Sequence, residues 1–245
     1  MTAKRRIDQL LVERELAESR ARAQALVMAG LVFIGGARID KPGQQVRSDA
    51  QIDVRGRDHP WVGRGGVKLA HAIDHFHLDP SGAVAMDIGS STGGFTEVLL
   101  EHGAEHVFAV DVGTNQLAWK LRQDPRVTVL EQTNARSLTA ASINRPCDWV
   151  VCDASFIGLA KVLEVPLALA APTCTLVALI KPQFEVRREE VGKGGIVRDP
   201  DLHERVCAEV QAWLETGSWT VLGITESPIT GSEGNVEFLV AAQRG

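Results

Sequence analysis

The chain has 245 residues, of which 44% are hydrophobic and 23% charged, close to the averages for soluble globular proteins. Its basic start is not followed by an apolar segment, and no run of about 18 uninterrupted apolar residues occurs, so neither a signal peptide nor a membrane-spanning helix is predicted. The four cysteines form no C-x-x-C pair, which argues against a disulfide scaffold and a zinc site. We therefore expect a cytoplasmic protein without a bound metal.

The charge is distributed unevenly along the chain. The net charge is −5, yet residues 1–58 contain 11 Lys and Arg against 8 Asp and Glu, whereas residues 59–245 contain 15 against 23. The first quarter is therefore basic and the remainder acidic. A phosphate-binding surface needs its positive charge concentrated in this way.

Residues 6–29 predict two short helices. Apolar residues recur at helical spacing from Ile7, Ser19 is a natural N-cap for the second helix, and Gly30 can adopt the left-handed conformation that ends it. Short strand-like pieces separated by turns follow. We expect residues 1–58 to form a small α+β domain. Its basic edge would include Lys4, Arg5, Arg6, Arg20 and Arg22.

The run RIDQLLVERELAESRARAQALVMAGLVFIGG resembles, along its whole length, the S-four type of RNA-binding domain first described in a small-subunit ribosomal protein. The resemblance implies that this domain binds RNA through the arginines of its basic edge. The same module occurs in enzymes with different activities, so it indicates RNA as a ligand but not the reaction.

A glycine-rich linker is predicted at residues 59–66, with Arg64 as a further candidate RNA contact, and a catalytic domain at 67–245. This domain follows a β-α-β rhythm. The predicted strands are 84–88, 106–110, 127–130, 149–152, 175–180, 219–224 and 236–241, and the predicted helices are 96–102, 116–122, 158–169 and 202–215. The last two strands have no helix between them, which favours an antiparallel end. We expect an α/β fold with a Rossmann-like seven-stranded sheet that binds ligands at the carboxyl ends of its strands.

The first of these strands runs into DIGSSTGGF, a glycine-rich turn before a helix. Glycine there lets the backbone approach a ligand closely. The spacing is not the G-x-G-x-x-G of a pyrophosphate site, and Asp87 suits a cationic ammonium group better than a phosphate. Asp111, after the second strand, could accept hydrogen bonds from ribose hydroxyls, which fits NAD as well as S-adenosylmethionine. Asn134 could line an adenine pocket. The pattern favours a nucleoside cofactor.

Four charged residues stand at unusual places. Lys68 opens the helix before the first strand, Asp153 and Lys181 close the fourth and fifth strands, and Glu237 lies inside the last predicted strand. A buried unpaired charge is costly, so these residues form either separate ion pairs or a catalytic group. Asp153 and Lys181 share the carboxyl edge with the two cofactor acids, which favours a catalytic group.

These four residues, together with DIGSSTGGF, VVCDASFIGL and LIKPQFE, resemble the FtsJ superfamily of ribose 2′-O-methyltransferases. Within it, the chain resembles the TlyA family of rRNA cytidine 2′-O-methyltransferases, often described as haemolysins, from about residue 6 to residue 240. The resemblance implies a methyltransferase sheet, S-adenosylmethionine as cofactor and ribosomal RNA in ribosomal subunits as partner. It implies a catalytic tetrad of Lys68, Asp153, Lys181 and Glu237. The implied cofactor-binding residues are Asp87, Gly89, Ser90, Gly93, Gly94, Phe95 and Asp111, with Phe156 shaping the pocket.

The tetrad suits transfer to a ribose hydroxyl, whose proton must leave as its oxygen attacks a sulfonium methyl group. We assign Lys181 as the base or hydroxyl-orienting group, assisted by Lys68, with Asp153 orienting Lys181 and Glu237 holding the ribose or a lysine. Amino-group methylases of bases typically carry two prolines where this chain has Asp153-Ala-Ser-Phe156. Carbon-5 methylation needs a cysteine nucleophile, and no cysteine is well placed.

Two other functions would depend on different sequence features. A membrane-active haemolysin would need a signal, an amphipathic membrane helix or a pore-forming hairpin, and none is predicted. A non-catalytic RNA-binding assembly factor would not need the intact tetrad. Only residues 241–245 follow the last predicted strand, which resembles a shorter form of the family and favours 23S over 16S rRNA as substrate. The charged, glycine-rich residues 186–196 predict a mobile substrate loop, and no protein partner is predicted.

Overall fold

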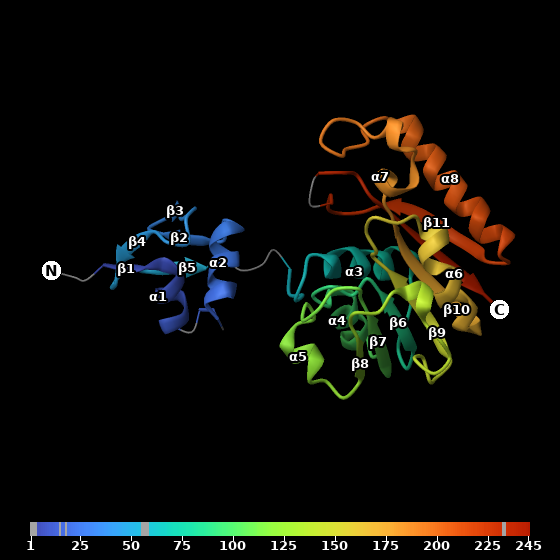
Figure 1. Cartoon of the computed structure of the whole chain (residues 1–245), viewed down its shortest axis with the longest axis horizontal. Coiled ribbons are helices and arrows are strands. Elements are labelled where there is room, and N and C mark those ends of the chain that lie inside the picture. Colours follow the sequence, from blue (N-terminus) through green and yellow to red (C-terminus); the bar gives the residue numbers. More distant parts are fainter. Residues whose placement is uncertain (1–3, 15, 18, 55–58, 232–233) are drawn as a thin grey trace. The chain divides into compact units, whose positions relative to one another are not determined.

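The computed structural model describes residues 4–14, 16–17, 19–54, 59–231 and 234–245. The chain divides into two compact units, Met1–Pro60 and Trp61–Gly245, which are treated separately (Figure 1). In the described residues no helix is long and apolar enough to cross a membrane.

The first unit is a small α+β domain. Its elements are β1 (Lys4–Arg6), α1 (Ile7–Glu13), α2 (Arg20–Met28), β2 (Val32–Ile34), β3 (Ala37–Arg38), β4 (Gln45–Arg47) and β5 (Ile52–Val54). Strand β1 pairs with β4, and β2 pairs with both β3 and β5. The predicted cap is present, because the Ser19 hydroxyl accepts a hydrogen bond from the Arg22 amide at 3.2 Å. Gly30 has the expected positive φ of 71°.

A buried carboxylate organises this unit. Asp8 on α1 is fully buried and accepts hydrogen bonds from Arg6 Nε and Nη2 at 3.0 and 2.8 Å, from Arg20 Nε at 3.0 Å and from Gln24 Nε2 at 3.1 Å. The Arg6 guanidinium, and after it the other donors, hold the pKa of Asp8 well below its usual range. Two arginines of the predicted basic edge are therefore held in place by one acid.

Asp8→Asn should destabilise the first unit. The depressed pKa of Asp8 adds stability that is present above about pH 4, the unfolded value, and is lost as the pH falls below it. The free energy of unfolding of the variant should be lower by about 1–3 kcal/mol at pH 7. It should also depend less on pH between pH 6 and pH 3. Hydrogen exchange of the α1 and α2 amides in the full chain measures this. Asp40→Asn, which removes an exposed partner of Arg38, is the matched control. Equal pH dependence in wild type and Asp8→Asn would contradict the assignment.

The second unit is built on a seven-stranded sheet, as predicted. The strand order is β11-β12-β10-β9-β6-β7-β8, and β12 is antiparallel to both β10 and β11. The strands are β6 (Val84–Ile88), β7 (His106–Val110), β8 (Val127–Leu130), β9 (Cys147–Cys152), β10 (Ala170–Ile180), β11 (Thr220–Glu226) and β12 (Phe238–Arg244). The helices are α3 (Gly65–Phe76), α4 (Gly94–Glu101), α5 (Trp119–Arg122), α6 (Leu159–Leu169), α7 (Pro182–Glu185) and α8 (Pro200–Thr216), with short 3-10 turns η1 (Ala135–Ser137) and η2 (Arg188–Glu190).

Alternate residues of the strands face two separate apolar cores. Met86, Phe108 and Val150 pack with α6 and α8 on one face, whereas residues such as Val107 and Val151 pack with α3 and α4 on the other. The ribbon shows these helices beside the sheet (Figure 1). Helices therefore cover both faces of the sheet, so a ligand site must lie at its edges.

Three details differ from the sequence predictions. Glu237 lies just before β12 and not inside it, because the strand begins where Phe238 pairs with Ile180. The same strand continues to Arg244, which pairs with Cys174, so residues 241–244 belong to the strand and only Gly245 follows it. Helix α5 begins at Trp119 instead of residue 116, because the amides of Asn115, Gln116 and Leu117 bind Glu131.

The start of the second unit packs closely on its own core. Trp61 and Val62 lie against the cluster of α3 and α4, and the Val62 amide donates to Glu97 on α4. A Cβ on Gly66 would lie 2.3 Å from the Trp61 side chain, so glycine is required there. Residues 61–66 of the predicted linker thus belong to the second unit by their contacts.

Candidate active site

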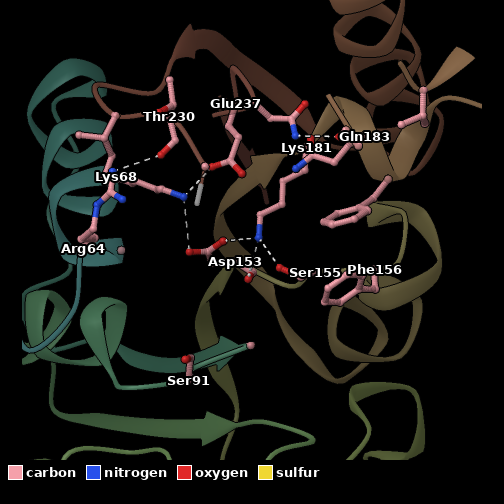
Figure 2. A pocket seen from close by; sticks show the side chains of 18 residues that line it. Arg64, Lys68, Ser91, Asp153, Ser155, Phe156, Lys181, Gln183, Thr230 and Glu237 are labelled. Atoms are coloured by element: carbon pink, nitrogen blue, oxygen red, sulfur yellow. Dashed lines mark hydrogen bonds and ion pairs between the residues drawn. The ribbon is translucent and has the colours of Figure 1, made fainter. Parts of the chain in front are cut away.

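Four elements bring the predicted tetrad together at the carboxyl edge of the sheet (Figure 2). Lys68 comes from the first turns of α3, Asp153 follows β9 and Lys181 follows β10. Strand β12 runs antiparallel to β10, so its first residues lie beside the end of β10. Glu237, immediately before β12, therefore reaches the same edge.

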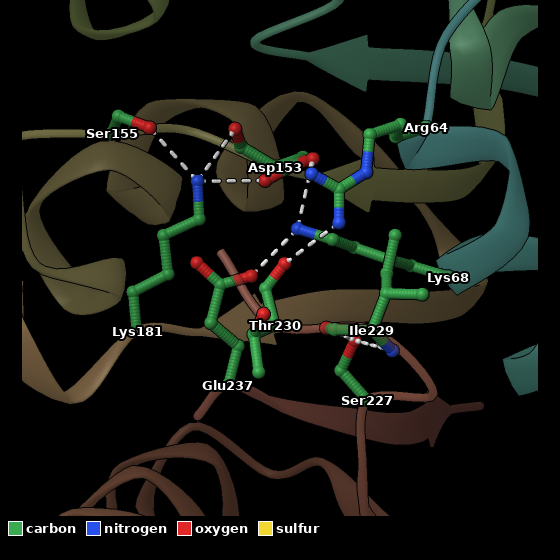
Figure 3. Close-up of polar contacts among 9 residues, drawn as sticks. All are labelled: Arg64, Lys68, Asp153, Ser155, Lys181, Ser227, Ile229, Thr230 and Glu237. Atoms are coloured by element: carbon green, nitrogen blue, oxygen red, sulfur yellow. Dashed lines mark hydrogen bonds and ion pairs between the residues drawn. The ribbon is translucent and has the colours of Figure 1, made fainter. Parts of the chain in front are cut away.

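The four side chains alternate in charge. Lys68 Nζ lies 2.6 Å from Glu237 Oε2 and 3.9 Å from Asp153 Oδ2, and Lys181 Nζ lies 2.7 Å from Asp153 Oδ1 (Figure 3). Both lysines are 7% exposed and Glu237 is 3% exposed. Each buried charge has an opposite partner, which offsets the cost of removing it from water.

Ser155 is a further partner of Lys181 that sequence reasoning did not single out. Lys181 Nζ donates to Ser155 Oγ at 2.8 Å and to the Asp153 carbonyl at 3.2 Å, in addition to the Asp153 carboxylate. Two of the three N–H donors of the ammonium group are thus used in hydrogen bonds, and the carboxylate contact is an ion pair. The sequence signal was its position two residues after Asp153, at the end of a buried strand.

Two cavities meet at this group. One of about 600 Å³ is lined by the whole tetrad, by Arg64 and by Phe156, whose side chain is 89% exposed. A neighbouring cavity of about 340 Å³ is lined by Asp111, Val112, Asn134 and Ala135. Both are lined by Gly89, Ser91, Asp153, Ser155 and Phe156. Groups bound in the two cavities would face each other across Asp153 and Ser155.

The glycine-rich turn forms the floor of this region. Gly89 has φ of +82°, and a Cβ there would lie 3.0 Å from the backbone of Ala154. Gly93 also has positive φ and packs against Leu121. Ser90, Gly94 and Phe95 line a smaller cavity of about 220 Å³. Glycines are needed here because the turn touches neighbouring chain on both sides.

Asp111 and Asn134 lie on the wall of the 340 Å³ cavity, as the cofactor prediction requires. Asp111 accepts hydrogen bonds from the Ser91 and Gly113 amides at 2.8 and 2.7 Å, which fixes its carboxylate. Glu131, which was not predicted, holds the Asn115–Leu117 amides and Arg122, and these contacts, the Arg122 hydrogen bond first, lower its pKa to about 2. Glu131 thereby positions Gln116 on the cavity wall.

Asp87 lies beneath the turn and does not line the cavities described above. It is fully buried, and Thr96 Oγ1 donates to its Oδ2 at 2.6 Å. In the described residues its Oδ1 has no hydrogen-bond partner. Burial raises the pKa of Asp87 from its ordinary value of 3.8 to about 7. Its direct contact with a cofactor remains a prediction.

The predicted RNA-binding arginines lie in both units. Arg5 pairs with Glu13 at 2.9 Å, Arg6 and Arg20 bind Asp8, and Arg22 lies on α2. Arg64 belongs to the second unit, where its Nη2 donates to the Thr230 carbonyl at 3.4 Å beside the 600 Å³ cavity.

A glycine-rich turn after the first strand of a seven-stranded sheet whose last strand is antiparallel is the arrangement of S-adenosylmethionine-dependent methyltransferases. One such enzyme from Mesorhizobium loti superposes on 74% of this chain, over its own full length, with a TM-score of 0.53 at 15% identity, which shows the fold alone. A Streptococcus thermophilus structure described as a candidate hemolysin superposes over 100% of this chain and 90% of its own, with a TM-score of 0.78 and 41% identity.

The FtsJ-like methyltransferase family matches residues 61–244, and the S4 domain family matches residues 5–52. The 16S/23S rRNA (cytidine-2′-O)-methyltransferase TlyA of Mycobacterium tuberculosis is 45% identical over 98% of this chain and 90% of its own length. Hemolysin A of Brachyspira hyodysenteriae is 37% identical over 96% and 98%. The chain therefore belongs to the FtsJ-like methyltransferases that carry an S4 domain, the group that includes TlyA.

Asp87→Asn should stabilise the cofactor-free protein above neutral pH. Because the folded pKa of Asp87 is raised, the folded state binds more protons than the unfolded state, and unfolding free energy falls as pH rises from about 4 to about 7. The rise in pKa corresponds to roughly 4 kcal/mol. Urea denaturation at pH 5 and 8 measures the difference, with the exposed Asp74→Asn on α3 as control. Parallel pH dependence in wild type and Asp87→Asn would disprove this assignment.

Proposed function

We propose that this enzyme transfers the methyl group of S-adenosylmethionine to the ribose 2′-hydroxyl of a cytidine in ribosomal RNA. The observation that carries the proposal is the buried Lys68–Asp153–Lys181–Glu237 group at the junction of two cavities. The relatives named for cytidine 2′-O-methylation of rRNA support the substrate. The S4 domain supports RNA binding by the first unit.

The residues of the 340 Å³ cavity fit a nucleoside cofactor. Asp111 offers a fixed carboxylate for ribose hydroxyls, and Val110, Val112 and Ala135 offer apolar surface for a base. The buried carboxyl of Asp87 below Gly89 suits the cationic amino group of a methionine moiety. When bound, S-adenosylmethionine supplies a methyl group activated by the sulfonium.

The substrate hydroxyl would enter from the 600 Å³ cavity and meet Lys181. Asp153 holds Lys181 by charge, whereas the Ser155 hydroxyl is neutral and can rotate away. A substrate hydroxyl can therefore replace Ser155 as a partner of Lys181. Lys181 Nζ would hold the hydroxyl and take up its proton as the ribose oxygen attacks the methyl group, and the Asp153 carboxylate lies beside the lysine to balance its charge. Glu237 neutralises Lys68 beside it. Alignment of the reacting atoms across the cavity junction supplies much of the rate.

The choice of ribosomal RNA is part of the proposal. The Mycobacterium relative is named for both 16S and 23S rRNA, and a Campylobacter jejuni relative, 32% identical over 73% of this chain and 69% of its own, for 23S rRNA. We propose 23S rRNA in the large subunit as the substrate to test first, with 16S rRNA as the second.

Lys181→Ala should abolish methylation. Wild type and variant are incubated with labelled S-adenosylmethionine and undermethylated large or small ribosomal subunits, and 2′-O-methylated nucleosides are quantified. Loss of the proton acceptor should lower the rate by about 10²–10⁴-fold. Lys161→Ala, an exposed lysine on α6, is the control. Full activity in Lys181→Ala would reject the assignment of the base. No label on either subunit despite cofactor binding would reject the proposed substrate.

Ser155→Ala tests the positioning of Lys181. Without the Ser155 hydroxyl, the ammonium form of the lysine loses one of its three acceptors. Single-turnover methylation should slow by about tenfold, with unchanged cofactor affinity. Ser142→Ala, whose hydroxyl pairs with Thr139, is the control. A single-turnover rate equal to that of wild type would show that the Ser155 hydroxyl does not position Lys181.

A further inference from the structure

The segment of residues 186–197 borders the cavity that the tetrad lines and carries three cations, Arg187, Arg188 and Lys193, against two acids, Glu189 and Glu190. It follows α7 directly, five residues after Lys181, and Val191 and Gly195 line the 600 Å³ cavity that the tetrad lines. Figure 1 shows the chain looping out here between α7 and α8. Any RNA strand that reaches Lys181 through this cavity passes next to the segment.

The segment, predicted as a mobile loop, is held by specific contacts. Arg205 on α8 donates from Nη1 and Nη2 to both carboxylate oxygens of Glu190, each at 2.8 Å. Asn235, only 1% exposed, donates to the Gly195 carbonyl at 3.0 Å and accepts from the Val197 amide at 3.0 Å. A buried side chain and a bidentate ion pair therefore fix both halves of the segment next to the cavity.

The cationic side chains of the segment are exposed and take no part in these contacts. Arg187, Arg188 and Lys193 are exposed, as is Arg198 just beyond. Within the described part of the chain, Arg188 and Lys193 form no ion pair, Glu190 is paired with Arg205, and the segment's second acid, Glu189, is exposed. Residues 59–245 hold 15 Lys and Arg against 23 Asp and Glu, whereas this segment holds three cations against two acids.

An acidic unit repels RNA, yet its active site must admit a phosphate backbone. Exposed cations on a segment whose Val191 and Gly195 line the cavity offset that repulsion locally. Resting on the proposed function, we propose that Arg188 and Lys193 form a phosphate-binding arm that docks the RNA strand carrying the target ribose. The arm contacts RNA at the reacting nucleotide, in addition to the RNA binding proposed for the first unit.

The double variant Arg188→Ala with Lys193→Ala tests the arm in the full chain. Two measurements are made: affinity for labelled 23S rRNA without cofactor at several salt concentrations, and methylation of undermethylated large subunits. Two lost phosphate contacts should reduce the slope of log affinity against log salt by about 1.4. The KM for the RNA should rise about tenfold near 0.15 M salt, with kcat at saturating RNA and cofactor affinity unchanged.

The matched control is Arg126→Ala with Arg145→Ala. It changes net charge equally, but the exposed Arg126 and the partly exposed Arg145 precede β8 and β9, at the opposite edge of the sheet. Equal losses of RNA affinity in both double variants would mean that only overall charge matters and would overturn the proposal. An unchanged salt slope in Arg188→Ala with Lys193→Ala would overturn it as well. Because RNA affinity is measured without methylation, failure of the proposed reaction leaves this test intact.

Discussion

Asp153 stands between two buried lysines and is the acidic partner of Lys181. One of its oxygens lies 2.7 Å from Lys181 and the other 3.9 Å from Lys68, whose nearer acidic partner is Glu237 at 2.6 Å. Removing any one of the four leaves an uncompensated charge in a largely buried cluster. The positions of α3, β9, β10 and β12 all have to satisfy this arrangement, and so the fold and the active site constrain one another.

The cofactor side is ordered by backbone rather than by side chains. Gly89 lies against the backbone of Ala154, and Asp111 is held by two amides, so the turn and the strand ends form one packed layer. Asp153 and Ser155 flank Ala154 directly. A change in the packing of the turn therefore reaches the lysine-binding residues through a single intervening residue.

Much of this architecture could be predicted from the sequence. Apolar runs bounded by turn residues located all seven strands of the second unit, and the lack of a helix before the last strand indicated its antiparallel direction. Charges at the ends of apolar strands indicated Asp153 and Lys181. The contacts that hold the site were not predictable, because Asn235 and Glu131 act on residues distant in the chain. The start of β10 was missed too: its pairing with β9 is irregular between Ala170 and Thr175, and such a stretch has no regular alternation.

The strand order has a consequence for how the enzyme comes into being. β12 is the last strand of the chain but lies inside the sheet, between β10 and β11. Until it inserts, β11 has no neighbouring strand in the sheet and the lysines lack Glu237. A partly synthesised chain can already fold its RNA-binding domain and much of its glycine-rich pocket, yet it holds an incomplete charge cluster. Completion of the sheet and assembly of the four-residue charge cluster are thus one event, and a chain that lacks β12 is expected to be inactive.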